Sequence, residues 1–203
     1  MGRLVLVRHA PTAETGRTLY GRLPGHGLSE KGRQMAADLA ERLASVKLAA
    51  IYASPLERAM QTAEAIAALQ RKPVQSHEGL LEVDYGKWAG RSLKSLYPLK
   101  AWRLVVTTPS RVTFPEGESL LEAQARMVKT CQGLASRHRN QAVAAVSHAD
   151  TIKAALSHYL GQPLDLFNRI AATPASVAVI DLPEGGAPRV VTMNSNGDST
   201  TWQ

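Results

Sequence analysis

The sequence predicts an α/β fold, a three-layer sandwich in which helices flank a mostly parallel central sheet. Short apolar runs typical of buried strands alternate along the chain with longer segments of helical periodicity, the pattern of parallel strands joined by helices. Two of the apolar runs end next to a histidine, His9 and His148. Ligands in such folds bind beyond the carboxyl ends of the strands, so both histidines are candidates for a functional site.

The first strand is expected at Arg3 to Val7, where no polar residue interrupts the sequence from Leu4 onward. Continuous apolar runs are typical of strands buried on both faces of a sheet. The first helix should begin near Ser29, because a serine side chain caps the free backbone N–H groups of a helix start. Leucines and alanines then recur at helical spacing from Met35 to Ala44.

A second buried strand is expected at Ala49 to Ala53. Ser54 and Pro55 then resemble a capping residue followed by proline at the first helical position, which predicts a helix from Pro55 to about Leu69. A brief strand at Val74 to Ser76 follows. From Glu78 to Leu99 glycines, tryptophan and proline indicate a mixture of loop and short helix.

The second half of the chain repeats the alternation. It contains a long helical pattern at Glu118 to Arg137, an apolar run at Ala142 to Val146 and a second helix at Thr151 to Leu160. Two final strands are expected at Ser176 to Leu182 and Arg189 to Met193, joined by a Pro-Glu-Gly-Gly turn.

The length of 203 residues is enough for one sizeable core, so we expect one domain over residues 1–203. Lys and Arg number 24 against 17 Asp and Glu, a formal charge of +7 that would draw anionic ligands toward a cleft or simply maintain solubility. No zinc-finger spacing, basic helix with heptads or aromatic-studded basic strand is present, so we expect no nucleic-acid partner.

We also expect a location in the cytoplasm. The apolar start is too short for a signal peptide, and no apolar run approaches the ~20 residues of a membrane span. With Cys131 as the only cysteine, an internal disulfide and a thiolate metal cage are both excluded. The sequence gives no indication of oligomeric state.

Arg8 and His9 leave the first strand together, and a neutral imidazole is a competent nucleophile near neutral pH. His148 repeats this placement at the end of the run that closes with Ser147. Two histidines at strand ends of one sheet can converge on one ligand. Considered singly, each is equally well explained as a structural histidine.

Arg58 lies about one turn into the helix predicted after the second strand. A guanidinium beside a helix N-terminus suits a phosphate, although an isolated arginine there is usually a surface residue. Glu82 has apolar and aromatic neighbours that could desolvate it and raise its pKa, as a proton donor requires. Asp84 is an alternative for the same role, and either residue could be a solvated loop carboxylate.

Together these elements resemble the histidine phosphatase superfamily, which includes the phosphoglycerate mutases, over nearly the whole chain. The segments that carry the resemblance are Leu4 to Ala10 (LVLVRHA), Gly21-Arg22, Leu28 to Gly32 (LSEKG), Ser54 to Ala63 (SPLERAMQTA), Glu82 to Gly90 (EVDYGKWAG) and Ser147-His148. Each match alone is weak, but their number and order make the resemblance specific. It implies a phosphoglycerate mutase-like fold.

The resemblance also implies the roles of the residues. His9 would be the phosphorylated nucleophile and Glu82 the acid and later base, with Arg8, Arg58 and His148 binding the phosphate. The substrate side would include Ala10, Thr15, Gly21, Arg22 and Ala149. No metal and no cofactor are implied, and residues 77–117 are expected to form a lid or cap.

Three positions depart from the pattern of the family. Ala10 replaces a glycine and adds one methyl group near the site. Thr15 stands where many members have a phosphate-contacting asparagine. Ala149-Asp150 follows His148 where glycine is frequent, so Asp150 is expected to bring negative charge close to the site and to weaken phosphate binding.

The function expected from these residues is phosphomonoester hydrolysis on a small phosphorylated metabolite, through a phosphohistidine. Three alternatives remain: a phosphoglycerate mutase-type phosphomutase, a binding module that keeps the pocket as an anion receptor, and a zinc enzyme built on His9, His148 and Asp150. The chain has little room for insertions that shield a mutase intermediate from water, which favours hydrolysis.

Overall fold

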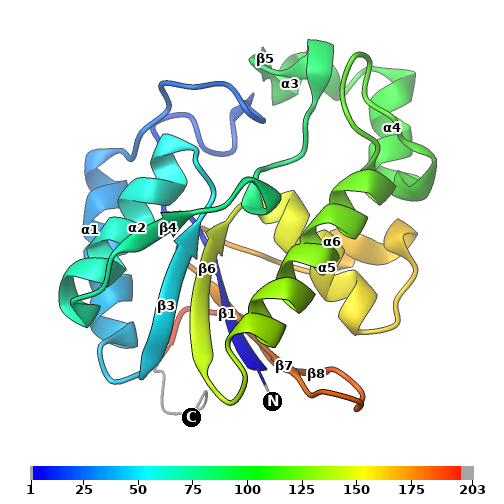
Figure 1. Ribbon diagram of the computed structural model, residues 1–203. Coiled ribbons are helices and arrows are strands. Elements are labelled where there is room, and N and C mark those ends of the chain that lie inside the picture. Colours follow the sequence, from blue (N-terminus) through cyan, green and yellow to red (C-terminus); the bar gives the residue numbers. More distant parts are fainter. Residues whose placement is uncertain (1, 198–203) are drawn as a thin grey trace.

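The computed structural model describes residues 2–197. Within them six strands form the main sheet, in the spatial order β4, β3, β6, β1, β7, β8 (Figure 1). Strands β4, β3, β6 and β1 are parallel to one another, whereas β7 is antiparallel to both of its neighbours, β1 and β8. The strands are β4 (Val74–Ser76), β3 (Leu48–Ala53), β6 (Ala142–Ser147), β1 (Gly2–Arg8), β7 (Val177–Leu182) and β8 (Arg189–Ser195). The predicted α/β class with a mostly parallel sheet is therefore confirmed.

Helices cover both faces of the sheet, which gives the three predicted layers (Figure 1). Side chains of α1 (Glu30–Leu43) and α2 (Glu57–Gln70) pack on one face with Val5, Val7 and Ile51. The opposite face, with Leu4 and Leu6, is covered by α5 (Leu120–Arg137) and α6 (Ala149–Tyr159). Successive residues of β1 thus point to opposite faces, and both are apolar because both are covered.

A third apolar cluster lies beyond the carboxyl ends of the strands and is built mainly on the segment between β4 and α5. Its buried side chains include Val83, Tyr85, Trp88, Leu96 and Phe114. Short elements make up this segment, namely η1 (Glu78–Leu80), η2 (Gly86–Trp88), β5 (Arg91–Ser92), α3 (Leu93–Leu96), α4 (Lys100–Thr107) and η3 (Pro109–Arg111). Strand β5 pairs with β2 (Thr18–Leu19) in a separate two-stranded sheet. Between α6 and β7 the chain forms η4 (Leu164–Arg169).

Most predicted elements occur within a few residues of their expected bounds, but the start of α2 differs. We predicted Ser54 as its cap and Pro55 as its first residue, whereas α2 begins at Glu57 after Leu56, which makes no side-chain capping bond. The Ser54 hydroxyl is instead 2.8 Å from His148 Nε2. None of the helices in residues 2–197 combines the length and the apolar character that crossing a bilayer would require.

Candidate active site

Three neighbouring strands bring polar side chains to the same edge of the sheet. Strand β3 is followed by Ser54, β6 by His148 and β1 by His9. The strands are parallel and in register, with Arg8 opposite Ser147, so the residues that follow them emerge side by side. The rings of His9 and His148 have their centroids 5.1 Å apart. The structure therefore brings the two predicted histidines together.

The imidazole of His9 is held with one ring nitrogen toward the backbone and the other toward Arg58. Its Nδ1 atom is 2.7 Å from the carbonyl oxygen of Ala10, which can only accept a hydrogen bond, so Nδ1 carries the proton. Nε2 then has the lone pair, and Arg58 Nε donates to it at 3.3 Å. Burial and, next, the charge of Arg58 lower the pKa of His9 to about 3. The ring is thus neutral at pH 7, as a nucleophile must be.

Two arginines, the buried Arg58 and the partly buried Arg8, lie against the histidines. Arg58 is the second residue of α2 and donates through Nη2 to the carbonyl oxygen of Gly21 at 2.7 Å. Arg8 donates through Nη1 to the carbonyl oxygen of Ala172 at 2.6 Å. Burial lowers the pKa of both guanidinium groups from a high starting value, and both remain charged at neutral pH. They place two positive charges beside His9.

His148 is fully buried and precedes the first residue of α6. Burial, followed by its neighbours His9 and Arg58, moves its pKa well below the usual value, so this ring is also neutral. Among residues 2–197, its Nδ1 atom and the Nε atom of Arg8 have no hydrogen-bond partner. Arg8 lines the cavity described below, whereas His148 lies behind it and is not among the lining residues.

Glu82 lies in an irregular segment between η1 and η2 and is buried against the start of α6. Its Oε1 atom accepts hydrogen bonds from the backbone N–H groups of Val83, at 3.0 Å, and Thr151, at 3.4 Å. Burial, and then the nearby charge of Asp150, raise the pKa of this carboxyl to about 7. Glu82 can therefore exist in both the protonated and the ionised form near neutral pH.

The alternative acid, Asp84, occupies a different environment. Its side chain is 41% exposed, it accepts a hydrogen bond from the N–H group of Gly86, and it is not among the residues that line the cavity next to His9. The geometry thus favours Glu82 over Asp84 as the proton donor.

A cavity of about 480 Å³ opens beside His9 at the strand ends, and we call it the strand-end cavity. The candidate residues Arg8, His9, Arg58 and Glu82 line it. Of the expected substrate-side residues, Thr15, Gly21 and Ala149 also line it. The hydroxyl of Thr15 accepts a hydrogen bond from the N–H group of Thr12 at 2.8 Å, so it is already used in its own turn.

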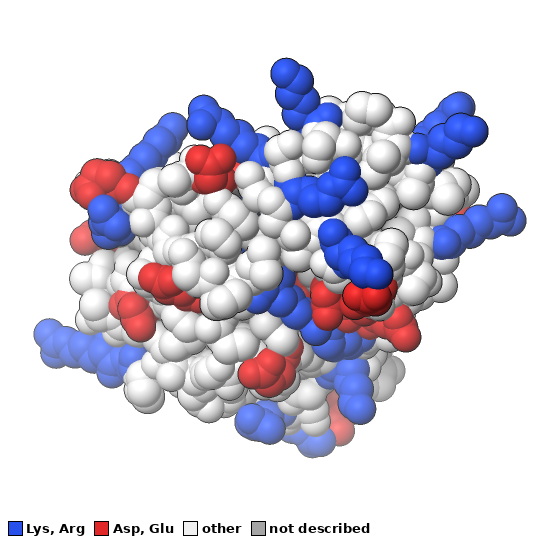
Figure 2. Space-filling model, turned by 90° about the horizontal axis from the view of Figure 1, so that it is seen from above, with Lys and Arg blue, Asp and Glu red and all other residues white. Residues whose placement is uncertain are grey.

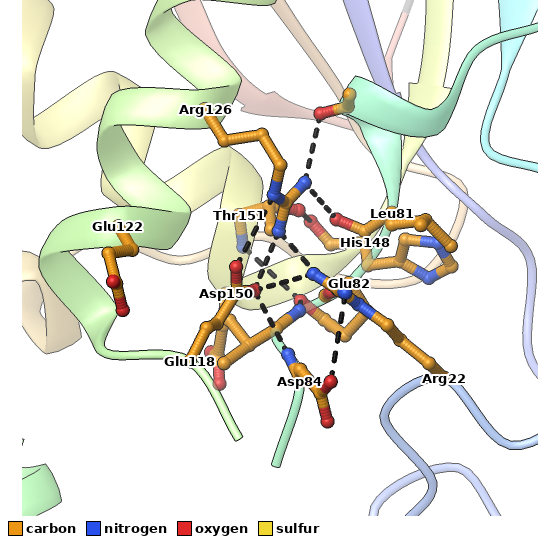
Figure 3. A network of polar contacts seen from close by, with 12 residues as sticks. Arg22, Leu81, Glu82, Asp84, Glu118, Glu122, Arg126, His148, Asp150 and Thr151 are labelled. Atoms are coloured by element: carbon orange, nitrogen blue, oxygen red, sulfur yellow. Dashed lines mark hydrogen bonds and ion pairs between the residues drawn. The ribbon is translucent and has the colours of Figure 1, made fainter. Parts of the chain in front are cut away.

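Two other expected substrate-side residues, Ala10 and Arg22, are not at the wall of this cavity. Ala10 is fully buried; its N–H group donates to Thr62 Oγ1 and its carbonyl oxygen orients His9. The guanidinium of Arg22 points toward the carboxylates of Asp84 and Glu118 (Figure 3). Its Nε atom donates to the carbonyl oxygen of Glu82 at 2.9 Å. The hydrogen-bond donors of Arg22 are thus bound by other parts of the protein.

The structure adds a polar group that the sequence analysis did not assemble. Asp150 accepts a hydrogen bond from the Tyr85 hydroxyl at 2.7 Å and is paired with Lys153 at 3.2 Å. Lys153 also donates to Asn168 at 2.8 Å and lies 4.2 Å from the centre of the Phe167 ring. The negative charge expected from Asp150 is thus present but balanced by Lys153. In the sequence, this ion pair is indicated only by the spacing of Asp150 and Lys153, which places both side chains on one face of the helix.

The remaining wall of the strand-end cavity is largely apolar. Side chains from α3, α4 and η4 supply this part, namely Leu93, Trp102, Val105, Val106 and Phe167. Lysine and arginine side chains are spread over the face above the strand ends, with acidic side chains between them, and they form no continuous patch of one sign (Figure 2).

The zinc alternative finds no support in the geometry. In the part of the chain that the structure describes, no three His, Cys, Asp or Glu side chains are grouped so that they could hold a metal ion. Asp150, which that alternative required as a ligand, is occupied by Tyr85 and Lys153.

Neutral buried histidines, one buried and one partly buried arginine, and a buried acid with a pKa near 7 gather at the strand ends of the sheet. These are the groups that an enzyme of phosphoryl transfer requires. Comparison with known proteins agrees. The family model described as histidine phosphatase superfamily (branch 1) matches residues 4–196. The chain therefore belongs to the histidine phosphatase superfamily.

Two relatives and one solved structure illustrate the similarity. The chain is 34% identical to phosphoserine phosphatase 1 of Hydrogenobacter thermophilus, over 91% of this chain and 88% of that protein. It is 31% identical to the probable phosphoglycerate mutase GpmB of Proteus mirabilis, over 89% of this chain and 85% of that protein. The structure of Bacillus stearothermophilus YhfR has a TM-score of 0.87 at 29% identity and covers 99% of each chain.

The protein is accordingly an enzyme of the histidine phosphatase superfamily, whose members act on small phosphorylated metabolites through a phosphohistidine. Recognition of the family from the sequence is thereby confirmed.

Proposed function

We propose that Nε2 of His9 is the atom that is phosphorylated and that Glu82 is the acid and base of the reaction. The orientation of His9 carries the proposal. Because Ala10 accepts from Nδ1, the lone pair of Nε2 is directed to the side of Arg58, where a phosphate would be held. A neutral imidazole fixed in this way is ready for in-line attack.

The phosphate is held by Arg8, Arg58 and His148 in this proposal. The two guanidinium groups supply donors and positive charge for the equatorial oxygens, which is the main requirement of phosphoryl transfer. The unpaired Nδ1 atom of His148 and Nε atom of Arg8 add donors that no protein group uses. The backbone N-terminus of α6 at Ala149, which lines the cavity, adds partial positive charge.

The reaction has two steps. In the first, Nε2 of His9 forms a bond to phosphorus, the bond to the ester oxygen breaks, and protonated Glu82 gives its proton to the leaving alkoxide. In the second, ionised Glu82 takes a proton from water, whose oxygen attacks phosphorus while the bond to nitrogen breaks. Inorganic phosphate leaves, and both His9 and Glu82 return to their starting forms.

The substrate proposal rests on the walls of the strand-end cavity. The segment 77–117, which we propose as the lid, contributes Leu93, Trp102, Val105 and Val106 to the wall, so it faces the alcohol half of the ester. Lys153, Asp150 and Asn168 supply the polar part. A small phosphorylated metabolite of mixed polarity fits these walls, and phosphoserine is the first compound to test because a relative is named a phosphoserine phosphatase.

The deciding experiment for the proposed roles is rapid acid or alkaline quenching of the enzyme during turnover of a ³²P-labelled ester. A phosphoprotein that is labile to acid, stable to base and absent from His9→Gln is the expected result. Acid-stable label, or label that persists in His9→Gln, would remove His9 as the acceptor.

Similarity to a probable phosphoglycerate mutase makes phosphomutase activity the second candidate. Incubation with 3-phosphoglycerate separates the two functions. We expect inorganic phosphate as the product, whereas accumulation of 2-phosphoglycerate without phosphate release would establish the mutase.

We also propose that the protein works in the cytoplasm. The single cysteine, Cys131, is fully buried in α5, and a chain without disulfides suits a reducing compartment. Fractionation of the source cells, followed by immunodetection, tests this location.

A further inference from the structure

Three charged side chains gather next to Glu82 without lining the strand-end cavity: Arg22, Glu118 and Arg126 (Figure 3). Glu118 lies between the two arginines. Its Oε1 atom is 2.9 Å from Arg22 Nη2 and 2.7 Å from Arg126 Nη2. The three residues come from distant parts of the chain, the loop after β2, the turn before α5 and the second turn of α5 itself. We call them the charged clamp.

The charged clamp binds the backbone that carries Glu82. Arg126 donates to the carbonyl oxygens of Gly79 at 3.0 Å and Leu81 at 2.8 Å, and more weakly to that of Glu82 at 3.4 Å. Arg22 donates to the Glu82 carbonyl oxygen at 2.9 Å. Glu118 accepts from the N–H group of Asp84 at 3.0 Å. The segment is therefore held on both sides of Glu82.

No helix or strand includes residues 81–84, so regular secondary structure does not fix their backbone. The charged clamp takes the place of a ladder of backbone hydrogen bonds. Guanidinium groups suit this task because their planar array of donors can bind several carbonyl oxygens and a carboxylate at once. Glu118 in turn fixes the direction of both guanidinium groups and neutralises part of their charge.

Placement of Glu82 matters for the chemistry because a general acid must be within hydrogen-bond reach of the oxygen that it protonates. Displacement by about 1 Å can lower a rate by about 100-fold. Esters with poor leaving groups depend on the proton, whereas p-nitrophenyl phosphate does not, because p-nitrophenolate is stable without one. A displaced Glu82 would therefore affect the two classes of ester differently.

We propose that Glu118, through Arg22 and Arg126, is a positioning residue that holds the Glu82 carboxyl toward the leaving group, an inference that rests on the proposed acid role of Glu82. The charged clamp itself touches no substrate. Its effect is on the two steps in which Glu82 moves a proton, and only the first of them, phosphorylation of His9, depends on the leaving group of the ester.

The test compares Arg126→Lys and Glu118→Gln with the wild type on an alkyl phosphate and on p-nitrophenyl phosphate. Arg126→Lys keeps the charge but cannot bind three carbonyl oxygens and Glu118 together. We expect the single-turnover rate of enzyme phosphorylation by the alkyl phosphate to fall about 10- to 100-fold, with less than about a threefold change in that rate for p-nitrophenyl phosphate. Equal losses for both esters would overturn the proposal, because a general structural defect acts on both.

Glu122→Gln is the matched control, since Glu122 belongs to the same helix but binds only Ser119 at the helix start and lies outside the charged clamp (Figure 3). We expect its kcat on both esters to equal that of the wild type. An alkyl-phosphate-specific loss in this control would show that α5 as a whole, and not the charged clamp, controls Glu82.

A double-mutant cycle separates failure of this inference from failure of the proposed function. In a Glu82→Gln background, Arg126→Lys should cause no further loss on the alkyl phosphate, because no acid is left to position. A full additional loss would overturn the positioning role. If Glu82→Gln alone shows no preference between the esters, the acid role itself fails. Arg22→Lys, at a partly exposed side chain, repeats the test if the other variants do not fold.

Discussion

The carbonyl oxygen of Ala10 lies 2.7 Å from the Nδ1 atom of His9, one residue along the chain. This contact fixes the tautomer of the imidazole, so the ring nitrogen with the lone pair is the one that faces Arg58. Ala10 therefore acts on the nucleophile through its backbone. A side-chain substitution at this position changes the packing but leaves the orienting group in place.

His9→Ala should reduce turnover of p-nitrophenyl phosphate to background, because the attacking atom is lost. His158→Ala, which removes an exposed histidine near the other end of α6, is the control and should retain full activity. Release of p-nitrophenolate measures both. Undiminished turnover by His9→Ala would mean that another group accepts the phosphoryl.

Glu82→Gln should slow phosphorylation of the enzyme chiefly for esters with poor leaving groups, because an amide cannot donate the proton that the alkoxide needs. Single-turnover measurements with an alkyl phosphate and with p-nitrophenyl phosphate give the two rates. A loss of the same size for both esters would contradict the acid role.

Asp150→Asn should move the alkaline limb of the pH profile to lower pH. The pKa of Glu82 is raised to about 7 by burial first and by Asp150 second, while the Val83 N–H group, Arg58 and Arg8 oppose the shift. The acid form is present below this pKa, so activity on an alkyl phosphate falls as the pH rises through about 7. Removing the charge of Asp150 lowers the pKa of Glu82, and the fall should begin earlier. The pH dependence of kcat between pH 5 and 9 checks the direction, and an unchanged or alkaline-shifted limb would contradict it.

Phe114→Ala should destabilise the fold by about 3–5 kcal/mol. The ring is 2% exposed and packs edge-on against Tyr85, with centroids 4.9 Å apart, in the apolar cluster beyond the strand ends. Leu121→Ala, at a side chain that is 49% exposed, should change stability by less than about 0.5 kcal/mol. Urea unfolding compares the two, and a similar small change in both would show that this cluster contributes little.

The central part of the site could be predicted because its signals are local. His9 and His148 each follow a continuous apolar strand, and Arg58 lies just inside the helix after another. Parallel strands bring such residues to one edge of the sheet, and this placement does not depend on the conformation of the loops. Glu82 had a weaker local signal, its apolar and aromatic neighbours, and the family resemblance favoured it over Asp84.

The parts that could not be predicted depend on contacts between distant segments. Ser54 looked like a helix cap because the preference of serine before proline is a local one, but its partner, His148, is 94 residues away. Arg126 contacts the Glu82 segment across more than 40 residues, and no local pattern in the sequence indicates this contact. Arg22 matched a family position, yet its guanidinium is bound by Glu118.

The two-residue strands β2 and β5 escaped detection because a pair so short has no periodicity to read. Helix α4 has only eight residues and lies between Pro98 and Pro109. Elements of this size are stabilised by their tertiary neighbours rather than by their own propensities.

The side chains that pack the sheet and those that enclose the far wall of the cavity belong to different apolar clusters. Substitution of Trp102 or Val105 is therefore expected to change the cavity wall and to leave the packing of the strands that end at His9 and His148 in place. Over evolutionary time, such an arrangement lets a lineage acquire a new ester as its substrate while the phosphoryl chemistry is inherited intact.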